Sequence, residues 1–234
     1  MIASPQNEKL KLVRKLRDRK HREREGLFVS EGEDLLAAGL TAGVKARFVL
    51  VAEGSGLAGE EVERELLDTV SELGSGTRTI AVWERPAPAP LEAPCVYLHS
   101  VADPGNVGAV VRSADAVLGA TVALGPECAD AFSHKAVRAS MGSLFARPPV
   151  AAGLQLTPGP RVALVAHGGE GAEGLETAAT ICLGSEREGL PAEIVAECDL
   201  AVTIPLHPGG AESLNVAAAA AIACDRMRRR SPDG

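Results

Sequence analysis

The sequence predicts an α/β protein of two parts, a small N-terminal α/β unit and a C-terminal domain built on a parallel sheet. Short apolar runs alternate with helical patterns along nearly the whole chain, and four prolines in twelve residues interrupt this alternation at 83–94. The later apolar runs have the almost continuous apolar character of strands that are buried on both faces. We therefore expect domains over residues 1–82 and 95–234, joined by a semi-rigid linker over residues 83–94.

The N-terminal part alternates helical and extended patterns. Leu10, Val13 and Leu16 recur at the spacing of one helical face, with basic residues around them. We expect helices over residues 7–19, 31–42 and 60–73, and strands over residues 27–30, 47–51 and 77–82. Such a unit of about eighty residues is long enough to fold as a domain.

The C-terminal part repeats the alternation with more apolar strands. We expect strands over residues 95–100, 121–124, 162–166, 180–183 and 200–204, and helices over residues 107–118, 133–145, 191–197 and 213–229. The last helix is almost free of polar residues from Leu214 to Cys224, so we expect it to be buried nearly all round. In such sheets, ligands bind beyond the carboxyl ends of the strands.

The chain is acidic overall but basic at its start. Its net charge is −7, yet residues 1–25 hold nine Lys and Arg against four Asp and Glu. A basic arm on an acidic body is typical of phosphate binding, and a solvated helix face with ion pairs is an equal alternative. Arg226 and residues 228–230 form a second basic cluster, which the dipole at a helix C-terminus would also favour.

Cysteine usage and the apolar runs indicate a cytoplasmic protein. The five cysteines are dispersed without a C-x-x-C pair, which favours reduced thiols over disulfides or a zinc site. No apolar run has transmembrane length, and the basic start lacks the apolar region of a secretory signal. Aromatic residues make up only 3% of the chain, so base stacking is not the expected mode of nucleic-acid binding.

Polar residues gather at the carboxyl end of the first strand of the second part. Asp103, Pro104 and Gly105 form a turn, and Asn106 stands where a helix N-cap belongs. Arg112 then follows on an otherwise apolar helix. It could pair with Asp115 one turn on, or it could be aimed at phosphate or at developing negative charge.

Two further carboxyl ends carry glycine-rich loops. Gly184 and Gly189 enclose an acidic segment and would let the backbone approach a ligand, with Glu186 as a hydrogen-bond acceptor. The alternative is an ordinary surface loop before Pro191, a first helical residue. Ile204-Pro-Leu-His-Pro-Gly-Gly-Ala-Glu-Ser-Leu-Asn-Val216 is a strand end and loop that leads into the last helix at Glu212-Ser213. Dinucleotide, P-loop, metalloprotease and α/β-hydrolase motifs do not occur, so these classes lose their main support.

Together, these three stretches resemble motifs 1, 2 and 3 of the SpoU/TrmH branch of the SPOUT RNA methyltransferases. They read Asn106-Val-Gly-Ala-Val-Val-Arg-Ser-Ala-Asp115, Gly184-Ser-Glu-Arg-Glu-Gly-Leu190, and Ile204-Pro followed by Glu212-Ser-Leu-Asn-Val216. Arg19-Lys-His-Arg22 and Phe28-Val-Ser-Glu-Gly32 are similar to the L30e-like substrate-binding domain of that family. The resemblance therefore covers nearly the whole chain.

The resemblance implies a deep trefoil knot, a homodimer, and methyl transfer from S-adenosyl-L-methionine to a ribose 2′-hydroxyl of RNA. The implied substrate is 23S rRNA, with tRNA as the alternative, and neither a metal nor a membrane is implied. The catalytic or substrate-positioning residues would be Asn106, Arg112, Glu186, Ser213 and Asn215. The cofactor-binding residues would be His167, Leu183, Gly184, Ile204, Leu206 and Leu214. The RNA-binding residues would be Arg14, Lys15, Arg19, Lys20 and Arg22.

Two positions depart from the family pattern. The loop from Pro205 to Ser213 is one residue longer than expected, with Pro208 where a glycine usually starts, and Arg187 replaces a small or polar residue in motif 2. Because a guanidinium is a poor base, we expect Arg112 to bind phosphate and stabilise alkoxide charge. Two competing hypotheses are a non-catalytic RNA-binding protein of the same fold and a small-molecule-binding α/β protein.

Overall fold

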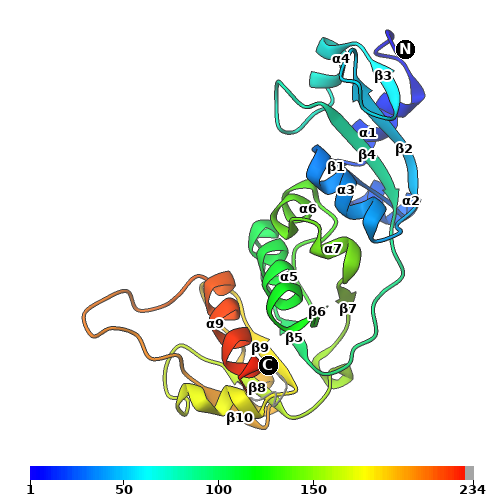
Figure 1. The fold of residues 1–234 in the computed structure, drawn as a ribbon. Coiled ribbons are helices and arrows are strands. Elements are labelled where there is room, and N and C mark those ends of the chain that lie inside the picture. The colour runs from blue at the N-terminus through cyan, green and yellow to red at the C-terminus, as the bar shows by residue number, and fades with distance from the viewer. Residues whose placement is uncertain (230–234) are drawn as a thin grey trace. The chain divides into compact units, whose positions relative to one another are not determined.

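The computed structural model describes residues 1–229 and groups them into two compact units. The N-terminal unit comprises Met1–Ala87 and Asp130–Ala146, and the C-terminal unit comprises Pro88–Ala129 and the chain from Arg147 onward. Arg230 of the C-terminal basic cluster lies outside the described residues. Each unit is built on its own sheet (Figure 1).

The N-terminal unit has a four-stranded sheet in the order β1-β4-β2-β3. The strands are β1 Leu27–Glu31, β2 Ala46–Ala52, β3 Glu60–Val62 and β4 Thr79–Glu84. β4 pairs antiparallel with β1 and β2, while β3 runs parallel to β2 at the edge. The helices are α1 Glu8–Lys15, α2 Arg19–Glu25, α3 Glu33–Thr41 and α4 Arg64–Asp68. As the spacing predicted, Leu10, Val13 and Leu16 are buried in the core of this unit.

Two predicted helices of this unit are shorter than expected. The first helix ends at Lys15 because Asp18 caps a second helix, α2, by accepting from the Lys20 N–H. The helix predicted over residues 60–73 is wrong at its start, over residues 60–62. There the chain forms β3, because its backbone pairs with β2, and a bridge between Ile2 and Val62 extends that pairing. Only α4 remains helical, with Leu66 and Leu67 buried.

Trp83 belongs to the sheet and not to the linker, which corrects the predicted boundary at residue 83. Its side chain is fully buried in β4, and its indole N–H donates to Ser30 Oγ at 2.8 Å. A Cβ at Gly39 on α3 would lie 2.5 Å from the Trp83 ring, so this glycine allows the close packing. Regular structure stops at Glu84, and the following proline-rich chain up to Pro94 contains neither helix nor strand.

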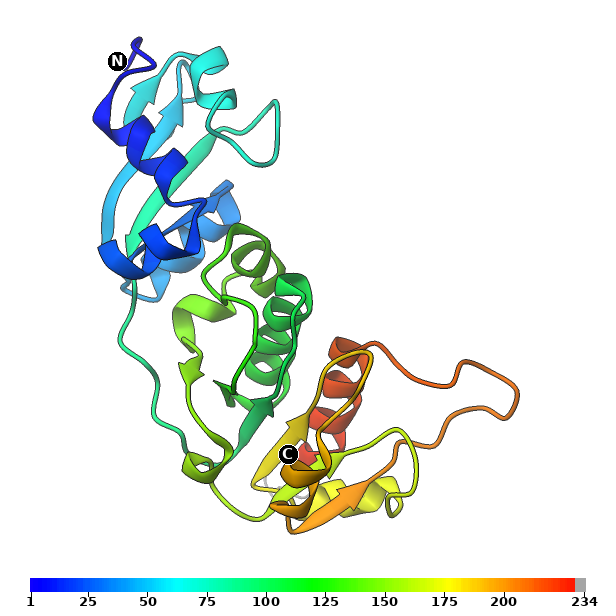
Figure 2. The ribbon, with the colours of Figure 1, turned by 180° about the vertical axis from the view of Figure 1, so that it is seen from behind.

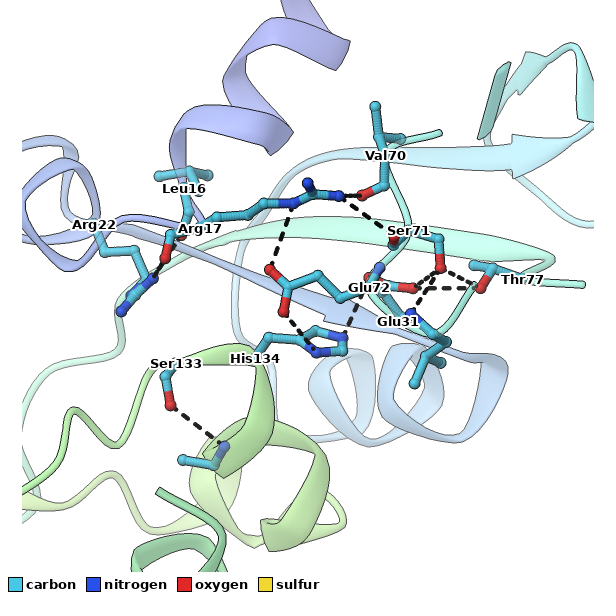
Figure 3. A network of polar contacts seen from close by, with 12 residues as sticks. Leu16, Arg17, Arg22, Glu31, Val70, Ser71, Glu72, Thr77, Ser133 and His134 are labelled. Atoms are coloured by element: carbon cyan, nitrogen blue, oxygen red, sulfur yellow. Dashed lines mark hydrogen bonds and ion pairs between the residues drawn. The ribbon is translucent and has the colours of Figure 1, made fainter. Parts of the chain in front are cut away.

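Residues 130–146 fall in the range predicted for the second domain, but they pack within the N-terminal unit. They form α6 His134–Ser140 and α7 Ser143–Ala146, and the helix predicted over residues 133–145 is interrupted at Met141, which has a φ of 48°. The rings of Phe132 and Phe145 lie 5.1 and 5.6 Å from the ring of Phe28. His134 contacts Glu31 and Glu72, so polar and aromatic contacts both hold this segment (Figure 3).

The C-terminal unit has a six-stranded sheet in the order β10-β8-β9-β5-β6-β7, and all its neighbouring strands are parallel. The strands are β5 Cys95–Leu98, β6 Thr121–Leu124, β7 Val150–Ala151, β8 Arg161–Leu164, β9 Thr180–Leu183 and β10 Leu200–Val202. The predicted parallel sheet is therefore confirmed, with the short edge strand β7 as an unpredicted addition. The helical segments are α5 Pro104–Leu118, η1 Leu154–Leu156, η2 Ala172–Thr177, α8 Ala192–Ala196 and α9 Val216–Arg228.

Both long helices of this unit begin at positions other than those predicted. Asp103, not Asn106, caps α5, because its carboxylate accepts from the Asn106 N–H at 2.9 Å. Asn215 caps α9 by accepting from the N–H groups of Ala217 and Ala218, so Glu212 and Ser213 precede the helix. Asn106 therefore lies inside the first turn of α5, whereas Asn215 is itself the N-cap of α9.

Helices α5 and α9 pack against each other, and α9 also contacts β9 (Figure 2). Burial of α9 is confined to one side, which corrects the expectation of a helix buried all round: Ala220, Ala223 and Cys224 are buried, whereas Ala218 and Ile222 are exposed. Within residues 1–229, none of the helices is long and apolar enough to cross a membrane.

Candidate active site

A cavity of about 400 Å³ lies at the carboxyl ends of β8 and β9 in the C-terminal unit. Its walls come from the chain that follows these two strands, from the loop after β10, and from the first turn of α9. The lining residues are 164–167, 183–189, 204, 206, 212–214, 216 and 219. The position is the one expected for a ligand site in a parallel α/β sheet, and the volume suits a small organic ligand.

All six residues predicted to bind the cofactor line this cavity. The structure brings together His167, Leu183, Gly184, Ile204, Leu206 and Leu214. Most of them are apolar, and charged residues line the same cavity. The cavity can therefore enclose an organic ligand and also contact the polar groups of that ligand. The assignment of these residues to a cofactor remains a prediction, but they share one site.

The loop after β9 is a closed turn that depends on two glycines. Ser185 and Gly189 exchange backbone hydrogen bonds of 3.1 and 3.0 Å, and the Glu188 N–H donates to Ser185 Oγ at 3.2 Å. A Cβ at Gly184 would lie 2.0 Å from the carbonyl carbon of Gly189, so a side chain there would open the turn. Gly189 itself has a φ of 70°, which favours glycine. The turn therefore holds Glu186, Arg187 and Glu188 at its tip.

Three of the five predicted catalytic residues form a hydrogen-bonded chain. The side-chain amide of Asn215 donates to Asn106 Oδ1 at 3.1 Å, and the amide of Asn106 donates to Glu186 Oε1 at 2.5 Å. Asn215 Oδ1 accepts from Ala217 and Ala218 at the start of α9, which leaves only its amino group free to donate. The start of α9 thereby fixes which group donates at each step of this hydrogen-bonded chain, from Asn215 to Asn106 to Glu186. The second oxygen of Glu186 remains open to a ligand.

The other two predicted catalytic residues are placed differently. Ser213 is exposed and lines the cavity. Arg112 is exposed on α5 and does not line it, because it lies six residues after Asn106, about 9 Å further along the helix. Asp115 bonds Arg147 at 3.1 Å, and among residues 1–229 Arg112 has neither a hydrogen bond nor an ion pair. The alternative in which Arg112 simply pairs with Asp115 is therefore wrong.

Arg22 does not fit its predicted role in RNA binding. It is only 5% exposed, and its guanidinium donates to the carbonyls of Leu16 and Arg17 and to Asp130. This buried charge is satisfied by its own unit, and removing one partner of such a group costs about 3–5 kcal/mol. Arg22 therefore has a structural role.

The other basic residues of the arm are partly neutralised. Arg19 pairs with Glu23 at 2.7 Å, and Arg14 donates to Pro5 O and Thr69 Oγ1. Lys15 and Lys20 are exposed, and within the described part of the chain their side chains make no hydrogen bond or ion pair. Of the five predicted RNA-binding residues, these two lysines are the most available to a phosphate.

The site residues predicted from the sequence leave out several residues that line the cavity. Arg187, Glu188 and Glu212 add charge to its walls, and Val216 and Ala219 of α9 add apolar surface. The spacing of Gly184 and Gly189 could have indicated that residues 185–188 belong to one turn and line the same cavity. Across residues 1–229, there is no group of three or more His, Cys, Asp or Glu side chains that could hold a metal ion.

The fold and the cavity are those of an α/β enzyme with a parallel sheet. Comparison with known proteins identifies this enzyme class as the RNA methyltransferases. Residues 93–225 match the model of the SpoU rRNA Methylase family, and residues 7–85 match that of the MRM3-like substrate binding domain. The chain belongs to the SpoU rRNA methylase family, as its three motifs predicted.

Relatives and solved structures agree with this assignment over the whole chain. The 23S rRNA (guanosine(2553)-2′-O)-methyltransferase RlmP of Bacillus subtilis is 31% identical over 97% of this chain and 98% of its own. The AdoMet-bound rRNA methyltransferase of Sinorhizobium meliloti is 29% identical with a TM-score of 0.84, covering 97% of both chains. The SpoU methyltransferase AviRb of Streptomyces viridochromogenes, also in complex with AdoMet, is 25% identical with a TM-score of 0.80, covering 96% of this chain and 98% of its own.

Proposed function

We propose that this protein transfers a methyl group from S-adenosylmethionine to a ribose 2′-hydroxyl of 23S rRNA. The observation that carries the proposal is that two features of one unit meet at Glu186. Glu186 lines the cavity at the ends of β8 and β9, and it also ends the hydrogen-bonded chain Asn215–Asn106–Glu186. Two relatives, RlmP of Bacillus subtilis and a methyltransferase of Streptomyces viridochromogenes, are named as 23S rRNA 2′-O-methyltransferases, which supports rRNA over tRNA.

The residues present fit S-adenosylmethionine. Leu183, Ile204 and Leu214 give the cavity apolar walls. Gly184 and Gly189 lie close together and have no side chains, so a ligand can approach their backbone at the cavity rim. The cofactor supplies a methyl group that is already activated on a sulfonium, so the reaction itself requires no metal. The remaining task of the protein is to hold the 2′-hydroxyl in line with that methyl group and to manage its proton.

The side chains at the cavity rim can perform the orienting step. Glu186 has an oxygen free to accept a hydrogen bond from the ribose hydroxyl, while Asn106 holds its other oxygen. Ser213, which lines the same cavity, can donate to or accept from the ribose. Arg112 lies on α5 outside the cavity lining, and in this proposal its guanidinium binds the RNA phosphate and stabilises the alkoxide that develops at the 2′-oxygen.

The protein acts as a homodimer in this proposal. Helix α9 exposes Ala218 and Ile222, one turn apart, and Ile222 is 39% exposed although it is large and apolar. A second copy packed on α9 would cover this surface and would bring further protein to the cavity rim. Sedimentation of the wild type and of Ile222→Lys tests this part, because a dimer held by α9 should become a monomer in the variant.

The deep trefoil knot is also part of the proposal. Strand β10 lies at one edge of the sheet, yet α9 contacts β9 in the middle of the sheet and packs on α5. Between Val202 and Val216 the chain lines the cavity at the ends of β8 and β9, and this return path supports the knot in the proposal. Refolding after complete denaturation would be slow if the knot must re-form.

The N-terminal unit serves as the RNA-binding domain in this proposal, with an L30e-like fold. The match of residues 7–85 to a substrate-binding domain and the exposure of Lys15 and Lys20 support this role. A cytoplasmic location, where rRNA is assembled into ribosomes, stays a prediction.

Methylation mapping tests the proposal directly. Purified protein is incubated with S-adenosylmethionine and with unmodified 23S rRNA or tRNA transcripts, and the 2′-O-methyl groups are then mapped. A single new site in 23S rRNA is the expected result, whereas methylation of tRNA alone would favour the alternative substrate. A protein that binds RNA but does not bind the cofactor in calorimetry would instead be a non-catalytic member of the fold.

A further inference from the structure

Arg187 occupies a distinctive position in the candidate active site. It lies at the tip of the closed turn that Ser185 and Gly189 form, and it lines the cavity. The turn is short and doubly hydrogen-bonded, so the backbone position of Arg187 is set before any ligand binds. Ligand binding to Arg187 would therefore require ordering of its side chain only.

The cavity wall holds one guanidinium group and three carboxyl groups. Among residues 1–229, Arg187 is the only Lys or Arg that lines it, and Glu186, Glu188 and Glu212 are the carboxylates that do so. Asn106 engages one oxygen of Glu186, but among residues 1–229 Arg187 has no hydrogen bond or ion pair with any of these carboxylates. Its five N–H donors are therefore available to a ligand.

The charges of this wall are complementary to those of S-adenosylmethionine. The cofactor carries two cationic groups, the sulfonium and the α-ammonium, and one anionic group, the α-carboxylate. Carboxylates of the wall suit the two cations, and the single guanidinium suits the single anion, which it can bind through two parallel hydrogen bonds. We propose that Arg187 binds the α-carboxylate of the methionyl part of the cofactor, an inference that rests on the proposed function.

An RNA phosphate is the other oxyanion that could reach this guanidinium. A phosphate at the turn would come close to Glu186 and Glu188 on either side of Arg187, and like charges at such distances repel. The cofactor carboxylate avoids much of this cost because its own ammonium lies two bonds away and can face the wall carboxylates. The charge pattern therefore favours the cofactor.

Calorimetric titrations of two proteins with two ligands test this assignment. The proteins are the wild type and Arg187→Gln, and the ligands are S-adenosylmethionine and decarboxylated S-adenosylmethionine, which keeps both cations and lacks the carboxylate. Because Arg187 is exposed, we expect Arg187→Gln to weaken S-adenosylmethionine about tenfold and to leave the decarboxylated ligand within about twofold. Arg187→Lys should restore part of the loss.

Arg228→Gln is the matched control, since it removes the same charge from an exposed arginine outside the cavity. An equal loss for both ligands in Arg187→Gln, or no loss for either, would overturn the assignment. So would a variant that keeps its affinity for S-adenosylmethionine but binds the RNA transcript more weakly, which would place a phosphate on Arg187. If the wild type binds neither ligand, the proposed function fails together with the assignment. If the wild type binds both, only the role of Arg187 is in question.

Discussion

The side-chain amide of Asn106 donates to Glu186 Oε1 at 2.5 Å, and so joins the first turn of α5 to the turn after β9. The same asparagine accepts from Asn215 at 3.1 Å, which adds the start of α9. Three segments that are distant in the sequence are thus aligned by two side-chain amides. Because the backbone of α9 sets the orientation of Asn215, the arrangement exists before a substrate binds.

Replacing Asn106 should slow methyl transfer without loss of the cofactor. Asn106→Ala removes the donor to Glu186, and we expect single-turnover methylation to fall about 10- to 100-fold while cofactor affinity stays within about twofold. Asn106→Asp should be at least as severe, because a carboxylate cannot donate and would face Glu186. The control is Gln155→Ala, which removes a similar bond of 2.6 Å to Glu197 away from the cavity. Full activity of Asn106→Asp would contradict the orienting role.

Arg112→Ala should nearly abolish methyl transfer while cofactor binding stays intact. Loss of a charge that stabilises developing negative charge costs about 10²- to 10³-fold in rate. Arg112→Lys keeps the charge but loses the planar donor pair, so an intermediate rate is expected. Arg147→Ala serves as a surface-arginine control, since Arg147 pairs with Asp115 on the same helix. The role is excluded if Arg112→Ala turns over like the wild type in a single-turnover assay.

Acid should destabilise the N-terminal unit through Glu31. Burial alone would raise the pKa of Glu31, but hydrogen bonds from His134, the Glu72 N–H and Ser71 outweigh it and lower this pKa (Figure 3). A lowered folded-state pKa contributes stability that is present above the unfolded pKa of about 4.5 and is lost as pH falls through the folded value. The free energy of unfolding should therefore decline below about pH 4.5.

The variant Glu31→Gln isolates this contribution. It keeps the shape of the side chain, and we expect it to lower the free energy of unfolding by about 1–3 kcal/mol at pH 7 and to flatten the decline in acid. Glu33→Gln, which removes an exposed pairing with Arg78, should cost less than about 1 kcal/mol. Urea unfolding between pH 3 and pH 7 measures both variants. An unchanged acid profile in Glu31→Gln would show that other groups control it.

Lys15 and Lys20 should contribute to RNA affinity through charge. The double change to Ala should weaken RNA binding and reduce the slope of log affinity against log salt concentration by about 1.5, because each phosphate contact contributes about 0.7–0.9. The matched control replaces Lys45, just before β2, and Arg47 on β2, which are both exposed and lie near Glu84. If both double variants lose the same affinity, the effect is one of net charge and not of the basic arm.

Much of the local structure could be predicted because its signals are local. Strands β6 and β9 occupy the predicted residues, and all six predicted cofactor-binding residues line the cavity. Five of them come from residues 183–184 and 204–214, and His167 follows β8 outside the three motifs. Errors arose where two local signals compete. Asn106 and Asn215 are both good N-caps, yet only Asn215 is one, because Asp103 captures the Asn106 N–H first.

The sequence by itself determined the alternation of elements, the glycines that the turn at residues 184–189 needs, and the family. Hydrophobic periodicity, helix capping and the backbone conformation of glycine all depend on residues only a few positions apart in the sequence. Only the tertiary structure decided that Arg22 is buried against Asp130 and that residues 130–146 pack with the N-terminal sheet. It also decided that Arg187 is the only Lys or Arg of the described chain in the cavity wall. Each depends on contacts between segments far apart in the chain, where burial and pairing outweigh local preference.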